Sequence, residues 1–586
     1  MRHAKAVFIP VTLTVILLFI FTVAHGQRKP APSAERHVNA AISLLEKQQA
    51  DRAILELKAA IRLKPDYADA HNLMGLALAR KGEIKPAIES FRKAIELDPK
   101  QHKTYRNLGM ALQEAGEIEA AAAAFRQSVS LAPDDAETRV LYAMALRQKG
   151  DVDYAIAELR EAIRLNPDLT EAHYHLGFLL ATKGLLREAA SEFETTVRLR
   201  PDYGEAHYYL GTARWFSDDL QGAIAALKTA ARLMPNHGDS HYYLGLALKK
   251  GGDLEGAIAE LTMAARLAPG QVEPQYAVGL ALQEDEDLDG AIAAFRAAIK
   301  LKPDFIQAYN DLGLALIRNR DPDGAIEAFN TAIKLEPVNL AAHHNLGMAY
   351  IQKSDYAAAV TQYRRLLALA PDSAEAHYNL GLALKNKDEF DEAIAELKKA
   401  IAIQPSLREA HYTLGVILMQ QSKLEQAAAS FRAAIAAKPD YAEAHYALGT
   451  VLQQQSDLDS AIAAFREALK HAPNAPEIHN TLGTALRQKG DVEAARREFQ
   501  EGARLNKRKS DLQAALFAFN TGVARLREGK LDEAIERFQA AIKLNPEDAQ
   551  AHYNLAKALH QKGSREAARA AYQKAKQINP RLKPLK

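Results

Sequence analysis

The residues of this sequence best suited to chemistry are histidines that recur at a regular spacing. Imidazole binds metals and transfers protons near neutral pH. These residues are His37, His71, His173, His207, His241, His343, His377, His411, His445, His479 and His552. Successive histidines are separated by 34 residues or a multiple of 34, except in the last interval. This spacing places each histidine on a separate helix, and packed helices lie about 8–10 Å apart. Metal ligands must lie about 2 Å from one ion. We therefore expect a structural stripe of half-buried, hydrogen-bonded histidines.

An acidic stretch at 285–290, DEDLDG, imitates the start of a calcium-binding loop. The twelfth position of such a loop requires a glutamate, and here it holds Arg296. The sequence also contains no GxxxxGK(S/T), no GxSxG and no HExxH. We assign no catalytic, cofactor-binding or metal-binding residue and expect no enzyme activity.

Composition narrows the classes of function. The chain has no cysteine, which excludes a disulfide framework, a thiol nucleophile and a cysteine-based metal site. Its 75 basic and 73 acidic residues nearly balance, so no bulk charge favours a nucleic-acid partner. A basic cluster near residues 496–509 is interleaved with glutamates and is expected to be a solvated helix face.

The elements that position these residues are visible in the stretch 440–473. Apolar residues from Ala444 to Leu452 recur at the three-and-four spacing of a helix, and those from Leu458 to Leu469 repeat that pattern. Ser456 and Asp457 separate the two patterns. Pro473 ends the second, because proline cannot continue a helix. The stretch predicts a pair of helices.

The pair is repeated along the whole chain. Prolines recur every 34 residues from Pro65 to Pro473, Lys507 takes the next place, and the series resumes at Pro546 and Pro580 after a five-residue insertion. We predict about sixteen helical pairs over 34–582. A chain of such repeats needs no single central core, because each repeat buries its apolar face against its neighbours.

The repeat resembles the tetratricopeptide repeat (TPR) family, whose pattern is W-x2-L-G-x2-Y, A-x3-F and P over 34 residues. The matching residues are His445, Leu448, Gly449, Leu452, Ala461, Phe465 and Pro473, with histidine in place of tryptophan. The resemblance implies an all-α, right-handed superhelical solenoid of helix-turn-helix repeats. Similar arrays occur in bacterial envelope proteins and, beside a catalytic domain, in O-linked N-acetylglucosamine transferases.

In that family the first helix of each repeat lines a concave groove that receives a protein or peptide. Here a tyrosine follows the histidine of many repeats, asparagine replaces it in others, and a Trp-Phe pair ends one first helix. Aromatic side chains with a polar group are typical anchors of interfaces. The expected partner-binding residues are Tyr174, Tyr208, Trp215, Phe216, Tyr242, Tyr276, Asn310, Tyr378, Tyr412, Tyr446 and Asn480. The alternative for each is packing at the seam between repeats.

A row of acidic residues near the starts of the first helices matches the capping-box pattern. Examples are Asp440-x-x-Glu443, Asp372-x-x-Glu375, Asp202-x-x-Glu205 and Ser406-x-x-Glu409. In a capping box the first side chain accepts a hydrogen bond from a backbone N–H three residues on, and the acid reaches back. We interpret the row as helix caps.

Residues 1–26 are interpreted as a signal peptide or an N-terminal anchor. Arg2 and Lys5 precede an apolar run from Ala6 to Ala24, and small residues follow where a signal peptidase cuts. The run is long for a cleaved signal and just long enough to span a bilayer, which takes about 20 residues. Either reading exports the repeats to the periplasm or the extracytoplasmic face of the membrane, with possible membrane attachment through residues 6–24.

The rest of the chain divides at one irregularity. We predict a linker at 27–33, a main array at 34–507, an insertion or joint at 508–514, a C-terminal pair of repeats at 515–582 and a basic tail at 583–586. Around the insertion, residues 504–514 lack the expected proline and carry four basic residues. The insertion either interrupts the stacking of repeats or forms a longer turn within it.

Together these features favour a non-enzymatic protein–protein interaction scaffold in the cell envelope, with a protein or peptide partner and no cofactor. Two alternatives are the repeat part of an O-linked N-acetylglucosamine transferase-like system and a passive structural spacer. No segment outside the repeats exceeds about 35 residues, which is small for a catalytic domain.

Overall fold

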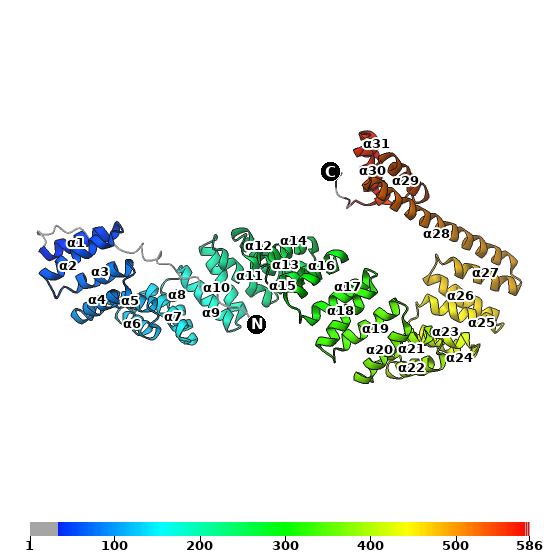
Figure 1. Ribbon diagram of the computed structural model, residues 1–586, viewed down its shortest axis with the longest axis horizontal. Coiled ribbons are helices and arrows are strands. Elements are labelled where there is room, and N and C mark those ends of the chain that lie inside the picture. The colour runs from blue at the N-terminus through cyan, green and yellow to red at the C-terminus, as the bar shows by residue number, and fades with distance from the viewer. Residues whose placement is uncertain (1–32, 581, 583, 585–586) are drawn as a thin grey trace. The chain divides into compact units, whose positions relative to one another are not determined.

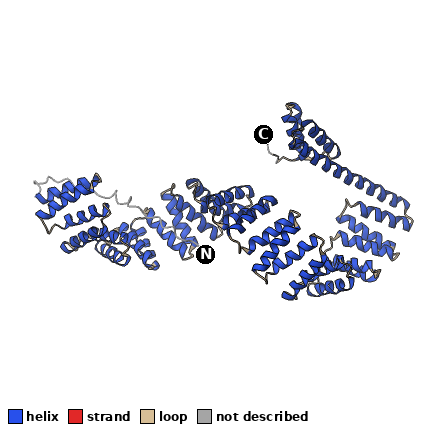
Figure 2. Ribbon diagram, viewed as in Figure 1, coloured by secondary structure: helices blue, strands red, loops and turns tan. Residues whose placement is uncertain are grey.

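The structure, a computed structural model, describes residues 33–580, 582 and 584. In this part of the chain it contains 31 α-helices and no strand (Figures 1 and 2). Helices follow one another as pairs, and each helix packs on the next one within its unit. The predicted all-α fold of helix-turn-helix repeats is confirmed. The predictions for residues 1–26 lie outside the described residues, as do most of the predicted linker at 27–33 and of the predicted basic tail at 583–586. Among the described helices, none is long and apolar enough to cross a membrane.

The chain forms two compact units, with a boundary between Asp287 and Leu288 that the sequence analysis did not predict. The helices of the first unit are α1 (Ser33–Glu46), α2 (Ala50–Leu63), α3 (Ala68–Arg80), α4 (Ile84–Leu97), α5 (His102–Glu114), α6 (Ile118–Leu131), α7 (Ala136–Lys149), α8 (Val152–Leu165), α9 (Thr170–Thr182), α10 (Leu186–Leu199), α11 (Gly204–Phe216), α12 (Leu220–Leu233), α13 (Gly238–Lys250), α14 (Leu254–Leu267) and α15 (Val272–Glu284).

The second unit continues the same alternation of a first and a second helix in each repeat. Its helices are α16 (Leu288–Leu301), α17 (Ile306–Arg318), α18 (Pro322–Leu335), α19 (Leu340–Gln352), α20 (Tyr356–Leu369), α21 (Ala374–Asn386), α22 (Phe390–Ile403), α23 (Arg408–Gln420), α24 (Leu424–Ala437), α25 (Ala442–Gln454), α26 (Leu458–His471), α27 (Pro476–Lys489), α28 (Val492–Arg527), α29 (Leu531–Leu544), α30 (Ala549–Gln561) and α31 (Arg565–Ile578).

Close packing within a repeat depends on a glycine facing a large side chain. Phe465 of α26 is fully buried and lies against Gly449 of α25. A Cβ atom on residue 449 would lie 2.6 Å from Phe465 Cε1, a distance that no ordinary contact allows. Glycine therefore lets the two helices approach closely. The same pairing joins Gly313 to Phe329 in another repeat.

The predicted capping boxes are wrong. The N-cap of α25 is Tyr441, one residue after Asp440, and its side chain makes no capping hydrogen bond. The N-cap residues of α11 and α23 are Tyr203 and Leu407, whose side chains also make no capping hydrogen bond. At α21 the N-cap residue is Ser373, and its side chain, not that of Asp372, accepts the capping hydrogen bond. The reason is a turn closed by the Tyr441 N–H donating to the Lys438 carbonyl oxygen, which delays the helix by one residue. The acidic row is therefore not held in capping boxes.

The insertion at 508–514 lies inside α28, which joins the second helix of the fourteenth repeat to the first helix of the fifteenth. Figure 1 shows α28 as one long helix. No proline or glycine occurs from 503 to 521, so nothing in the sequence ends the helix where Pro473 ends α26. Residues 506–510 are exposed on all sides. A continuous helix thus accommodates the extra residues, without the longer turn.

Candidate partner-binding surface

In the first unit, predicted binding residues of α9, α11 and α13 belong to a connected aromatic cluster. The rings of Tyr174 and Tyr203 have centroids 4.9 Å apart. Tyr208 lies 6.2 Å from Tyr243, and Tyr242 lies 5.3 Å from the same ring. All five rings are half-buried, so each packs on one side and remains partly accessible on the other.

Trp215 and Phe216, at the end of α11, differ in accessibility. Trp215 packs against a buried cluster of α12 and α13, and Lys250 lies over its ring with Nζ 5.3 Å from the centroid. Phe216 is 47% exposed and contacts Tyr243 edge-on at 5.9 Å. The structure thus gives Trp215 a seam-packing role and leaves Phe216 available to a partner.

Several of the tyrosines also have a packing role in their own repeat. Tyr174 lies 6.1 Å from Phe193, and Tyr446 lies 5.8 Å from Phe465, between ring centroids. These phenylalanines are fully buried, so the tyrosines cover the core as well as facing outward. Tyr276 is half-buried on α15. Seam packing and partner contact are therefore compatible at one tyrosine.

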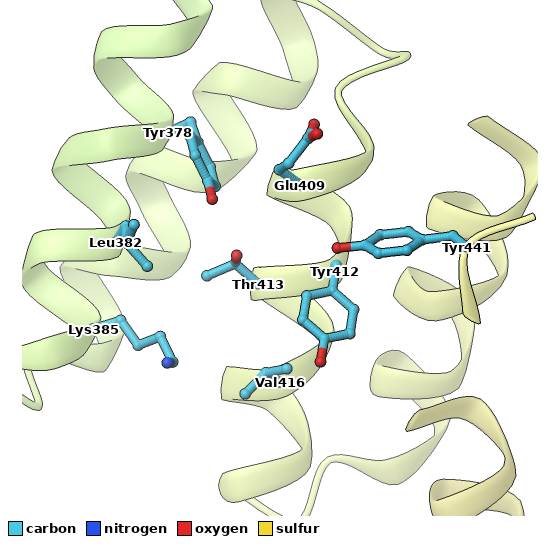
Figure 3. Close-up of a pocket in the computed structure, with 8 residues that line it drawn as sticks. All are labelled: Tyr378, Leu382, Lys385, Glu409, Tyr412, Thr413, Val416 and Tyr441. Carbon is cyan, nitrogen blue, oxygen red and sulfur yellow. The ribbon is translucent and has the colours of Figure 1, made fainter. Parts of the chain in front are cut away.

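In the second unit, two predicted residues line a pocket of about 270 Å³. Tyr378 of α21 and Tyr412 of α23 share it with Tyr441, which precedes α25. Figure 3 shows Tyr378 and Tyr441 on either side of Thr413. The pocket is also lined by Leu382, Lys385, Glu409 and Val416. First helices of two successive repeats and the start of a third thus build one site.

The pocket combines neutral hydroxyl groups with two charges of opposite sign. Burial raises the pKa of Tyr378 and that of Tyr412 above their ordinary value, so both phenols stay protonated at physiological pH. Burial, followed by the neighbouring Tyr412, raises the pKa of Tyr441 to about 12. Glu409 and Lys385 add a carboxylate and an ammonium group. The site can hydrogen-bond a polar group while its rings contact an apolar one.

The two predicted asparagines do not join this pocket. The Asn310 Oδ1 atom on α17 is buried and has no hydrogen-bond partner among the described residues. Asn480 Oδ1 lies 2.5 Å from the place where a Cβ atom of residue 502 would be. Its side chain therefore faces α28 of its own repeat, where Gly502 makes room for it.

The histidine stripe makes the structural hydrogen bonds that the sequence analysis expects. His173 Nε2 lies 2.9 Å from the carbonyl oxygen of Pro167, and His445 Nε2 lies 2.9 Å from that of Pro439. In these repeats the contact ties the start of the first helix to the preceding turn. No group of three potential metal-binding side chains occurs in the described part of the chain.

Sequence reasoning missed Tyr203, Tyr243, Tyr441 and also Tyr209, whose ring lies 6.1 Å from that of Tyr174 and 5.1 Å from that of Tyr208 and so connects the cluster of the first unit. Tyr203 and Tyr441 each follow a Pro-Asp pair, and the same triplet occurs at Tyr67, so a search for the second aromatic position of the repeat would have found them. The role of Tyr203 and Tyr441 depends on the turn between repeats, whose geometry the helical pattern does not reveal.

Family models match most of the chain. A tetratricopeptide repeat model matches residues 38–102, 174–232, 210–272, 276–340, 344–408, 412–476, 446–512 and 480–536. A second model of the same repeat matches 102–135 and 549–582, and a TPR repeat model matches 143–184 and 522–563. The chain belongs to the tetratricopeptide repeat family. Membership supports a role as a TPR protein-interaction scaffold.

Comparison with other proteins adds no closer assignment. No curated protein matches the sequence. Among solved structures, the TPR protein YrrB, described as having an unusual peptide-binding site, is 24% identical over 32% of this chain and 96% of its own, with a TM-score of 0.31. Yeast Tom70 is 19% identical over 75% and 97%, with a TM-score of 0.32. Naa15/Naa10 bound to HypK-THB is 14% identical over 94% of each chain, with a TM-score of 0.31. TM-scores this low carry no functional assignment.

Proposed function

We propose that this TPR protein is a non-enzymatic scaffold that binds a protein or peptide on the first-helix face of its repeats. The observation that supports it most is the pocket formed by Tyr378, Tyr412 and Tyr441. Its volume of about 270 Å³ is close to the lower end of ligand pockets, about 300 Å³, and suits one or two side chains of a peptide better than a cofactor.

The repeat makes this site extensible. Tyr174, Tyr208 and Tyr242 occupy in the first unit the repeat position that Tyr378 and Tyr412 occupy in the second. Each unit therefore offers aromatic contacts at repeat intervals, and an extended partner meets one such contact after another. Aromatic residues that are partly buried before binding lose little conformational freedom, which favours their use as anchors.

Capture of the partner from native envelope tests the proposal. The full chain is compared with Tyr378→Ala plus Tyr412→Ala, and the captured protein is identified. The matched control is Tyr154→Ala on α8, an exposed tyrosine of a second helix. We expect the double variant to lose capture and the control to retain it, with unchanged helicity in both. Equal capture by all three proteins would refute binding at this pocket.

We also propose that the scaffold acts in the cell envelope, either exported or held at the membrane by residues 6–24. The support is the apolar run from Ala6 to Ala24, preceded by Arg2 and Lys5. A reporter that is active only outside the cytoplasm, fused after residue 40, tests this location. Activity of a cytoplasm-specific reporter at the same position contradicts it. The N-terminus of the mature protein then distinguishes a cleaved signal from a retained anchor.

A further inference from the structure

The first helix of the fifteenth repeat exposes a face that the other repeats bury. Phe517 of α28 is 73% exposed, whereas Ala444, its equivalent in α25, is fully buried. Ala524 of α28 is also exposed, whereas its equivalent Val451 is fully buried. Both positions are buried in each described repeat after the first, apart from the fifteenth. We call the surface formed by Leu512, Leu516, Phe517 and Ala524 the open leading face of α28. Leu512 and Leu516 are 41% and 60% exposed.

This face does not have the composition of a natural end of the array. The first repeat also lacks a preceding repeat, and at the two equivalent positions it carries Arg36 and Ser43. End repeats of a solenoid need such a polar outer face. Phenylalanine at 517 and alanine at 524 are residue types that usually occupy buried positions. The leading face of α28 therefore has the composition of a surface that stacks on another repeat.

The repeat that precedes it in the sequence cannot provide that stacking while α28 is continuous. The second helix of the fourteenth repeat and the first helix of the fifteenth are the two halves of α28 itself. At every other junction within the two units, the chain turns between the second helix of one repeat and the first helix of the next, and those two helices pack side by side. Along α28, Arg496 and Glu528 are separated by about 48 Å, at 1.5 Å per residue.

The fourteenth repeat leaves the complementary face uncovered. Val492 at the start of α28 is 63% exposed, although its equivalent Leu458 is partly buried. Ala503 is also exposed. At the end of the array the last repeat carries Arg565 and Lys576 at these two positions, which suits a solvated surface. We call the surface of Val492, Arg496 and Ala503 the open trailing face of α28.

We propose that a second copy of this chain covers both faces, by a reciprocal exchange around α28. The leading face of each copy stacks on the trailing face of the other, as successive repeats stack within one chain. Exchange of identical elements is a common route to a symmetric dimer. This dimer does not depend on which partner binds at the tyrosine-lined surface of the first helices.

Charge supports this pairing. In an ordinary junction, a Cβ atom on Gly251 would lie 3.3 Å from Ile224 Cδ1 of the preceding repeat. In the fourteenth repeat Arg496 takes the place of Ile224, and in the fifteenth Glu528 takes the place of Gly251. Stacking of the two faces therefore brings the Arg496 guanidinium group to the carboxylate of Glu528, which also pairs with Arg525 and Lys530 of its own chain.

Thiol cross-linking tests the exchange cleanly, because the chain has no cysteine of its own. The full chain carrying both Arg496→Cys and Glu528→Cys is treated with a short bis-maleimide and examined on a denaturing gel. We expect cross-linked dimers, because the two sites of one copy are too far apart to be bridged. Mixing chains that each carry one of the two substitutions should give the same dimer. The control carries Ile224→Cys and Gly251→Cys, which should cross-link within one chain.

Each other outcome overturns the proposal. A cross-link within a single chain would show that α28 breaks and the two faces stack in one copy. Absence of any cross-link, when the control reacts, would show that the faces do not stack. A second measurement is the mass in solution. Phe517→Lys should raise the dimer dissociation constant at least tenfold, and Tyr154→Lys, at an equally exposed tyrosine, should leave it unchanged. An unchanged dimer in Phe517→Lys refutes the exchange.

Discussion

His173 Nδ1 lies 2.6 Å from Glu192 Oε2, between the two helices of one repeat. The other ring nitrogen, Nε2, lies 2.9 Å from the carbonyl oxygen of Pro167. A carboxylate and a carbonyl oxygen only accept hydrogen bonds, so the ring must donate from both nitrogens, which requires the imidazolium form. The hydrogen bond to Glu192 raises the pKa of His173, although burial opposes the shift.

The pair predicts a pH dependence of local stability. Because the pKa of folded His173 is raised above the unfolded value of about 6.5, the stabilisation is present below that pH and is lost as pH rises through the folded pKa. Glu192→Gln removes it. We expect hydrogen exchange in α9 and α10 to accelerate in this variant at about pH 5.5, by an amount equivalent to about 1 kcal/mol. The difference should shrink as the pH rises above neutral.

The chain contains its own control for this substitution. In the α19–α20 repeat, Gln362 takes the place of the glutamate and lies with Nε2 2.6 Å from His343 Nδ1. An amide N–H can only donate, so Nδ1 of His343 accepts this hydrogen bond, and Glu192→Gln copies a geometry already present. Hydrogen exchange in α19 and α20 should be the same in Glu192→Gln as in the parent protein. A constant difference between variant and parent from acidic to alkaline pH would mean that His173 is not charged.

Ser456 offers a second test, at the turn between α25 and α26. Its φ of +67° lies in the left-handed region, which costs a side-chain-bearing residue about 1–2 kcal/mol. Ser456→Gly should raise local stability by about 0.5–1 kcal/mol after the extra entropy that glycine loses on folding. The equivalent residue one repeat later is Gly490, with φ of +94°. Gly490→Ala should therefore act with the opposite sign. Slower hydrogen exchange in Ser456→Gly and faster exchange in Gly490→Ala would confirm both.

The fold could be predicted from the sequence because the repeat specifies it many times over. The small residue at Gly449, the large one at Phe465 and the terminating Pro473 each have a local physical role, and their spacing alone predicts the helical pair. Side-chain details of the turns could not be predicted. Asp440 matched a cap by spacing, but the turn before Tyr441 shifts the helix start by one residue and so removes the cap.

The candidate site was predictable only in part, for a similar reason. The position shared by Tyr378 and Tyr412 follows from the helical period, and the structure places both at one pocket. The same position in α27 holds Asn480, whose shorter side chain turns toward Gly502. Tyr441 enters the pocket from a turn, which periodicity does not describe. Local packing decides which residues of a repeated position face a partner.

Limited proteolysis should cut the chain first within α28. Lys507, Arg508 and Lys509 are exposed on all sides, and no other helix of the same chain covers this part of α28. Local opening of such a helix costs little, and proteases bind opened backbone. Mild trypsin treatment should therefore give two fragments that meet near residue 508. Replacing the three basic residues by glutamine should remove this early cut. Early cuts spread over the turns between repeats would contradict the prediction that α28 opens most easily near residue 508.

The two aromatic residues that end α11 allow stability and binding to be separated within one turn of helix. Trp215 packs against the core of its seam and is covered by Lys250, so Trp215→Ala should destabilise α11 and α12 by about 2 kcal/mol, less than the 3–5 kcal/mol of a fully buried tryptophan.

Phe216, which is 47% exposed, contributes little to that packing. Phe216→Ala should leave the melting temperature unchanged and weaken partner capture by up to about 2 kcal/mol, which is the usual cost of losing an interface anchor and corresponds to about a thirtyfold change in affinity. Tyr242→Ala, one repeat along the chain, should lower both quantities, because that ring packs on Tyr243 while facing outward. If Phe216→Ala and Tyr242→Ala both leave affinity intact while only Tyr242→Ala lowers the melting temperature, the aromatic cluster of the first unit packs the seam between repeats and the partner binds elsewhere.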